Sequence, residues 1–227
     1  MSVVPATRIT AVVFDFDGVI ADTEGLHLRA FQDVFERRGW QLDERAYFDR
    51  YLGYDDTGLV VAFGQEHALG FDEAAVETLV DEKTRLFARY LDAGEVLFPT
   101  APACIDRLAA AYALGIASGA LKIEITSILD AARLRHHFPV IVAADDVSAC
   151  KPDPEPYLKA AAGLGVDPAQ CLAIEDSPAG LAAARTAGMR TIGLTTTSPR
   201  HLLTDADLIL DGLHQISAET VARLGRD

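Results

Sequence analysis

Short apolar runs alternate with longer amphipathic stretches through most of the chain. The runs are apolar at nearly every position, which is typical of strands in a parallel sheet that is covered on both faces. They predict strands at residues 11–14, 114–117, 140–143, 172–174, 191–194 and 208–210. The Ala-rich stretches between them predict helices at residues 101–111, 123–132, 155–164, 178–187 and 218–224.

This alternation of strands and helices indicates an α/β protein with a Rossmann-like, three-layer α/β/α core around a parallel sheet. One stretch, residues 23–95, breaks the pattern, because it holds amphipathic helical stripes and no convincing strand. We therefore expect an all-helical cap domain at 23–95, inserted into a core domain formed by 1–22 and 96–227. Ligands of open α/β sheets bind at the carboxyl edge of the strands, which is where such an insert would start.

Composition narrows the possible partners. The 227 residues include 20 Lys and Arg against 34 Asp and Glu, which gives a net charge of −14. A charge of that sign argues against binding to nucleic acid or to an anionic membrane surface, since both need clustered cations. No apolar run is long enough to span a membrane, and the N-terminus carries no secretory signal pattern. We therefore expect a cytoplasmic protein; the oligomeric state is not encoded in any pattern that we recognise.

The first predicted strand ends in an acidic pair. Asp15 and Asp17 follow the apolar run 11–14, and Gly18 comes directly after them. An Asp-Gly turn would explain Asp17 and Gly18, but not Asp15, because an unpaired carboxylate beside a buried strand is costly to desolvate. The pair is better explained by chemistry at the strand end.

A second acidic pair, Glu175 and Asp176, ends another predicted strand. In a parallel sheet both pairs would converge at one edge, where four carboxylates cannot all stay ionised without a cation. Oxygen-only ligands favour Mg²⁺ over zinc. The alternative is that these two acids cap the helix at 178–187, but Ser177 is better placed to do so.

Two further positions suit a phosphate group. Ser118 and Gly119 follow a predicted strand and precede a helix, so a hydroxyl and backbone N–H groups could meet an anion there; a plain turn explains them equally well. Lys151 lies in a proline-rich segment after another strand, near the predicted acidic cluster. Lysines usually lie at the solvated surface, but this position favours a functional role.

Together these residues resemble the haloacid dehalogenase superfamily, in the subgroup of phosphatases similar to β-phosphoglucomutase. The four motifs of that family occur here in the family's order: Asp15-Phe16-Asp17-Gly18-Val19, then Ser118, then Lys151-Pro152-Asp153-Pro154, and Glu175-Asp176-Ser177.

The resemblance implies a role for each motif. Asp15 would be the nucleophile that forms an aspartyl-phosphate, and Asp17 the general acid and base. Mg²⁺ would be held by Asp15, the backbone carbonyl of Asp17 and Asp176, with Glu175 behind them. Ser118, Gly119 and Lys151 would bind the transferring phosphoryl group, since phosphoryl transfer depends on positioning and charge neutralisation.

Residues of the expected cap domain provide hints about the class of substrate. His27 matches a cap histidine of the β-phosphoglucomutase-like group, although a histidine beside Phe31 and Val34 could equally be a packed core residue. The mutase grips a distal phosphate with a cap arginine, whereas residues 51–58 here offer two acids and no arginine; Arg50 is the nearest substitute.

We therefore expect a Mg²⁺-dependent phosphatase that acts on a small phosphorylated metabolite such as a sugar phosphate. The alternatives are a sugar-phosphate mutase and, from another class, a non-catalytic phospho-acceptor module. A metal-free dehalogenase is disfavoured because Asp17 and the second acidic pair would then have no task.

Overall fold

The computed structural model describes residues 8–52, 54–91 and 96–225. The chain divides into two compact units. The first, the core unit, combines Met1–Asp22 with Leu97–Asp227, and the second, the helical unit, is Thr23–Val96.

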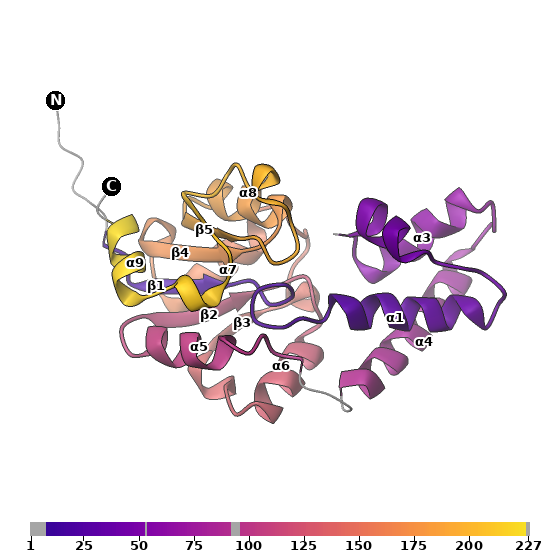
Figure 1. Ribbon diagram of the computed structural model, residues 1–227, viewed down its shortest axis with the longest axis horizontal. Coiled ribbons are helices and arrows are strands. Elements are labelled where there is room, and N and C mark those ends of the chain that lie inside the picture. The colour runs from indigo at the N-terminus through magenta and orange to yellow at the C-terminus, as the bar shows by residue number, and fades with distance from the viewer. Residues whose placement is uncertain (1–7, 53, 92–95, 226–227) are drawn as a thin grey trace. The chain divides into compact units, whose positions relative to one another are not determined.

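The core unit is built on a six-stranded sheet in the order β3-β2-β1-β4-β5-β6, and every neighbouring pair is parallel. Figure 1 shows these strands side by side with helices around them. The strands are β1 Ala11–Phe14, β2 Ala113–Ala117, β3 Val140–Val142, β4 Cys171–Glu175, β5 Arg190–Leu194 and β6 Leu208–Leu210. All six agree with the predicted runs to within a residue at either end, so the predicted α/β class with a parallel sheet is confirmed.

The strands are mostly apolar because helices cover the sheet. Ala11 and Val13 of β1 pack in one cluster with residues of α7 and α8, while the alternate residues Val12 and Phe14 are also fully buried. The helices of this unit are α5 Ala101–Ala109, α6 Lys122–Ala131, α7 Glu155–Leu164, α8 Pro178–Thr186 and α9 Ala218–Leu224.

Helix α8 shows how local sequence sets the end of an element next to the acidic pair. The side chain of Ser177 accepts a hydrogen bond from the backbone N–H of Gly180 at 3.0 Å, so Ser177 caps the helix, as its position in the sequence predicts. The helix ends at Thr186, and Gly188 follows in the left-handed region at φ +88°. The helix is therefore capped by Ser177 and not by Glu175 or Asp176.

The helical unit has its own apolar core. Helix α4 packs against both α1 and α3. Phe35 and Phe63 stack at the centre, with ring centroids 4.2 Å apart. The elements of this unit are α1 Glu24–Glu36, α2 Glu44–Ala46, a π-helical turn at Tyr47–Tyr51, α3 Asp56–Glu66 and α4 Glu73–Leu91.

In the part of the chain that the structure describes, no helix combines the length and the apolar character that crossing a bilayer requires.

Candidate active site

The two acidic pairs meet at one edge of the sheet because their strands are neighbours. β1 pairs with β4 in a register that places Phe14 opposite Ile174. The backbone N–H of Asp15 continues the ladder and donates to the carbonyl of Ile174 at 2.9 Å. Asp15 and Glu175 therefore leave the sheet side by side, at its carboxyl edge.

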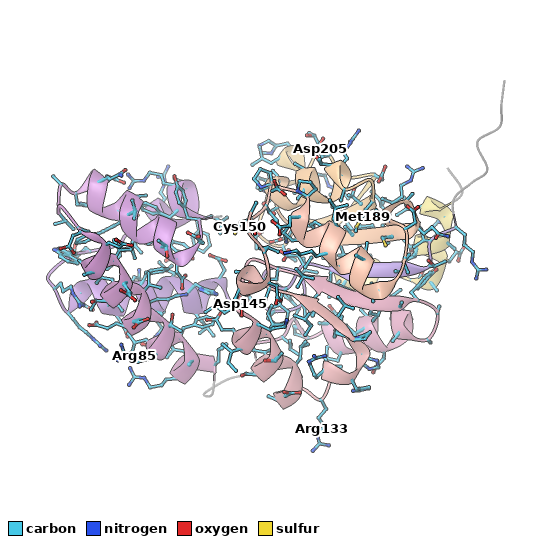
Figure 2. The ribbon with its side chains drawn as sticks, turned by 180° about the vertical axis from the view of Figure 1, so that it is seen from behind. Arg85, Arg133, Asp145, Cys150, Met189 and Asp205 are labelled. Atoms are coloured by element: carbon cyan, nitrogen blue, oxygen red, sulfur yellow. The ribbon has the colours of Figure 1, made fainter. Side chains whose placement is uncertain are left out.

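Three carboxylates and one lysine form a buried cluster at this edge. The carboxylate oxygens of Asp15, Glu175 and Asp176 can be chosen so that all lie within 4.8 Å of one another, and all three residues are buried. The Nζ of Lys151 lies 2.8 Å from Asp15 Oδ1 and 2.6 Å from Glu175 Oε1. Lys151 follows Cys150, which is labelled in Figure 2, on the segment that leads into α7. We call this group the core cluster; it holds a single cation for three carboxylates.

Glu175 is held on both of its oxygens. Oε1 accepts from the hydroxyl of Tyr157 at 2.8 Å as well as from Lys151. Oε2 accepts from the backbone N–H groups of Asp176 and Ser177 and from the Ser177 hydroxyl. Burial alone would raise the pKa of Glu175, but Lys151, Tyr157 and the Ser177 amide together lower it. Glu175 is thus an ionised anchor for Lys151.

Asp176 is fixed against a glycine. Gly18 has φ +74°, and a Cβ at that position would lie 2.0 Å from Asp176 Oδ2. The residue must therefore be glycine for two reasons, the backbone conformation and the close approach of the carboxylate. The hydroxyl of Thr197 donates to the same oxygen, Asp176 Oδ2.

The cluster carries more negative charge than Lys151 can balance. Burial raises the pKa of Asp15 to about 7, and the charges of Glu175 and Asp17 add to this against the opposing effect of Lys151. Burial also raises the pKa of Asp176 well above its usual value, with Glu175 and Asp15 contributing. Carboxylates that are unfavourable as a set become favourable when they share a cation. Buried oxygen donors of this kind fit a hard metal ion.

The remaining predicted residues of the core unit lie on adjacent loops. Asp17 is half-buried, two residues beyond Asp15. Ser118 is buried at the end of β2, next to β1, and its Oγ accepts from the N–H of Ala120 at 3.0 Å. Gly119 is exposed, with open space where a Cβ would point. β1, β2 and β4 therefore bring the acidic and the phosphate-binding candidates to the same edge of the sheet.

His27 lies in the helical unit and takes part in a second lysine cluster. Its Nδ1 lies 2.6 Å from the Nζ of Lys83, which also donates to both oxygens of Asp56 at 2.7 Å. The His27 ring packs against Phe87, with centroids 4.0 Å apart. We call Lys83, Asp56 and His27 the helical-unit cluster. His27 is thus both packed and hydrogen-bonded, which neither sequence interpretation included.

Sequence reasoning missed three functional candidates. Tyr157 and Thr197 bind carboxylates of the core cluster, and Lys83 is fully buried and ion-paired within an amphipathic helix of the insert. A signal existed for Thr197, because a run of three threonines follows the strand β5, whose carboxyl end lies at the same edge. No comparable signal marks Tyr157 or Lys83.

Comparison with known proteins agrees with this geometry. Fructose-1-phosphate phosphatase YqaB of Escherichia coli is 31% identical over 185 residues, which cover 80% of this chain and 94% of that protein. The crystal structure of a CbbY mutant from Rhodobacter sphaeroides with xylulose-(1,5)bisphosphate has a TM-score of 0.82 at 28% identity and covers 94% of this chain and 99% of that one. β-Phosphoglucomutase from Clostridium difficile has a TM-score of 0.83 at 27% identity, with 96% and 97% covered. The family model described as haloacid dehalogenase-like hydrolase matches residues 12–194, and the chain belongs to this family.

Proposed function

We propose that the protein is a Mg²⁺-dependent phosphatase that hydrolyses a small phosphorylated metabolite, such as a sugar phosphate, through an aspartyl-phosphate on Asp15. The observation that carries the proposal is the core cluster, in which a buried Asp15 touches Lys151 and shares its surroundings with two more carboxylates. The relatives support the same reaction class, since one of them is named a phosphatase of fructose 1-phosphate.

The reaction has two balanced steps. In the first, a carboxylate oxygen of Asp15 attacks phosphorus, the bond to the ester oxygen breaks, and Asp17 gives its proton to the leaving alkoxide. In the second, Asp17 takes a proton from water, which attacks the same phosphorus and breaks its bond to Asp15. Inorganic phosphate leaves, Asp15 is again a carboxylate, and Asp17 is again protonated.

Charge neutralisation supplies most of the rate. Lys151, held by Glu175, would contact the phosphoryl oxygens, and Ser118 with the backbone at Gly119 would bind them from the next strand end. Asp15, the backbone carbonyl of Asp17 and Asp176 would hold Mg²⁺, which neutralises charge on the phosphoryl group when bound. Positioning of this kind matters more than acid catalysis, which contributes only about 10²- to 10⁴-fold.

The helical unit would act as the cap, with His27 as a substrate-contacting residue. The surroundings of Arg50 in this unit favour a phosphatase over a mutase. Arg50, the nearest substitute for a phosphate-gripping cap arginine, is ion-paired with Glu66 and lies over the ring of Tyr51. A mutase remains the second candidate because of the likeness to β-phosphoglucomutase. Gly53, within the stretch 51–58, lies outside the described residues.

The test is phosphate release from p-nitrophenyl phosphate and from a panel of sugar phosphates, with Mg²⁺ and with EDTA. We expect many phosphates released per protein with Mg²⁺, none above background in EDTA, and recovery when Mg²⁺ is restored. A mutase would instead convert a hexose phosphate into its isomer with little phosphate released. A phospho-acceptor module would release at most one equivalent, and either result would contradict the proposal.

A further inference from the structure

The helical-unit cluster contains a lysine with no donor left for a ligand. The side chain of Lys83 is fully buried. Its ammonium has three N–H donors, and three acceptors lie within reach: both oxygens of Asp56 at 2.7 Å and Nδ1 of His27 at 2.6 Å. A phosphate that approached this unit would find the charge of Lys83 already neutralised.

Two aromatic rings next to the Lys83 ammonium explain why its charge has to be neutralised by an anion. The Nζ of Lys83 lies 5.1 Å from the ring centroid of Phe31 and 4.8 Å from that of Phe87. These faces attract a cation but cannot replace its hydration, so a buried ammonium there needs an anion in direct contact. Asp56 is that anion, and its side chain remains 27% exposed.

The same contacts fix the tautomer of His27. Because a lysine ammonium only donates, Nδ1 of His27 must accept, and the ring proton of the neutral imidazole is then on Nε2. Burial lowers the pKa of His27 well below its usual value, and the nearby charge of Lys83 lowers it further. The His27 side chain is 15% exposed. The cluster therefore offers an Nε2–H donor from a neutral ring and a partly exposed carboxylate acceptor, but no net positive charge.

Five of the seven other cations of the unit are engaged by partners, and the remaining two, Arg37 and Arg89, are exposed. Arg38, Arg45, Arg50 and Arg85 each pair with a carboxylate. Arg29 lies over the ring of Tyr90, and across residues 23–96 acidic residues outnumber basic ones by two to one.

We propose that Asp56, by neutralising Lys83, makes the enzyme select monophosphates whose remaining part is uncharged and rich in hydroxyl groups, and reject substrates with a second phosphate. This inference rests on the proposed phosphatase function, with the helical unit as its cap. A hydroxyl group can accept from His27 Nε2–H and donate to Asp56, whereas a second phosphate at this cluster meets a carboxylate and a lysine whose charge is already neutralised. The chain would differ in this from the CbbY that was crystallised with a bisphosphate.

The kinetic test compares kcat/KM for fructose 1-phosphate and fructose 1,6-bisphosphate in the full-length protein with Mg²⁺. We expect the wild-type protein to prefer the monophosphate by at least tenfold. Asp56→Asn frees the charge of Lys83 and should reduce that preference at least tenfold. The matched control is Asp81→Asn on the same helix as Lys83. Asp81 is exposed and pairs with Arg85, which points away from the helices in Figure 2, so the preference should stay at the wild-type value.

A measurement independent of turnover protects the test against a variant that does not fold. In the ¹⁵N spectrum of the wild-type protein at pH 7.5, His27 should show an unprotonated Nδ1 and a protonated Nε2. A proton on Nδ1, equal kcat/KM for the two fructose phosphates, or an unchanged preference in a folded Asp56→Asn protein would overturn the inference alone. If p-nitrophenyl phosphate and both fructose esters all fail to react, the proposed function falls and takes the inference with it.

Discussion

Two buried lysines, one in each unit, are surrounded by opposite balances of charge. Lys151 in the core cluster lies in contact with Asp15 and Glu175, and Asp176 lies within the same group of carboxylates. Lys83 in the helical-unit cluster has a single carboxylate partner, Asp56, together with the neutral ring of His27. The single positive charge of Lys151 is surrounded by three carboxylates, whereas that of Lys83 faces one carboxylate.

Under the proposed function, this difference in charge balance suits the core cluster to chemistry and the helical-unit cluster to substrate recognition. Burial raises the pKa of Asp15 and of Asp176, and the charges of neighbouring carboxylates add to the shift, so an added cation would stabilise the core cluster. The helical-unit cluster pairs one ammonium with one carboxylate and has no such need for a cation. Buried lysines therefore have to be interpreted through the number of acids around them.

The largest effect is expected from Asp15→Asn, which removes the nucleophile. We expect phosphatase activity to fall by about a thousandfold or more, as it does when nucleophiles of other enzymes are replaced. Without Mg²⁺ the free energy of unfolding should not decrease, because the variant removes one of several competing carboxylates. Steady-state kinetics and urea unfolding check the two parts, with the exposed Asp130→Asn as control. Turnover at the parent rate would refute the assignment of Asp15.

Removing each lysine in turn tests the comparison directly. Lys151→Met leaves Asp15 and the fully buried Glu175 without their cation, which should lower the free energy of unfolding by about 3–5 kcal/mol and abolish turnover. Lys83→Met leaves only Asp56, which is 27% exposed and can recruit water, so we expect a loss of about 1–3 kcal/mol.

Urea denaturation without Mg²⁺ measures both values. Lys159→Met is the matched control, because this lysine is 45% exposed and its pair with Glu155 should contribute at most about 1 kcal/mol. A larger loss for Lys83→Met than for Lys151→Met would show that the count of acids does not decide the outcome.

Some features of the fold and of the candidate site could be predicted from the sequence, and others could not. All six strands were predictable because the strands of a covered parallel sheet form short runs that are mostly apolar. The meeting of Asp15 with Glu175 followed from the rule that parallel strands end at one edge. Lys83 was not predictable, because within the stripe of α4 it occupies an apolar position, and its partners Asp56 and His27 lie 27 and 56 residues away. Tyr157 likewise acquires its partner only through the packing of α7 on the sheet.

Mg²⁺ should stabilise the protein without any change of sequence, and this stabilisation should depend on pH in one direction. At a hundred times its dissociation constant the ion should add about 2.7 kcal/mol to the free energy of unfolding. Because the pKa of Asp15 is raised to about 7, a proton occupies this carboxyl below pH 7 and competes with the metal. The affinity should therefore fall by at least about tenfold for each pH unit below 7, since the raised pKa of Asp176 adds a second competing proton.

Titration of the melting temperature with Mg²⁺ at pH 5.5, 6.5 and 8 measures this dependence. Lys83→Met should keep the full response, since its cluster has no surplus charge, whereas Asp15→Asn should lose most of it. An equal stabilisation of both variants, or a response that is stronger at pH 5.5 than at pH 8, would mean that the cation binds outside the core cluster. The surplus of acids around Lys151 would then need another explanation than a metal.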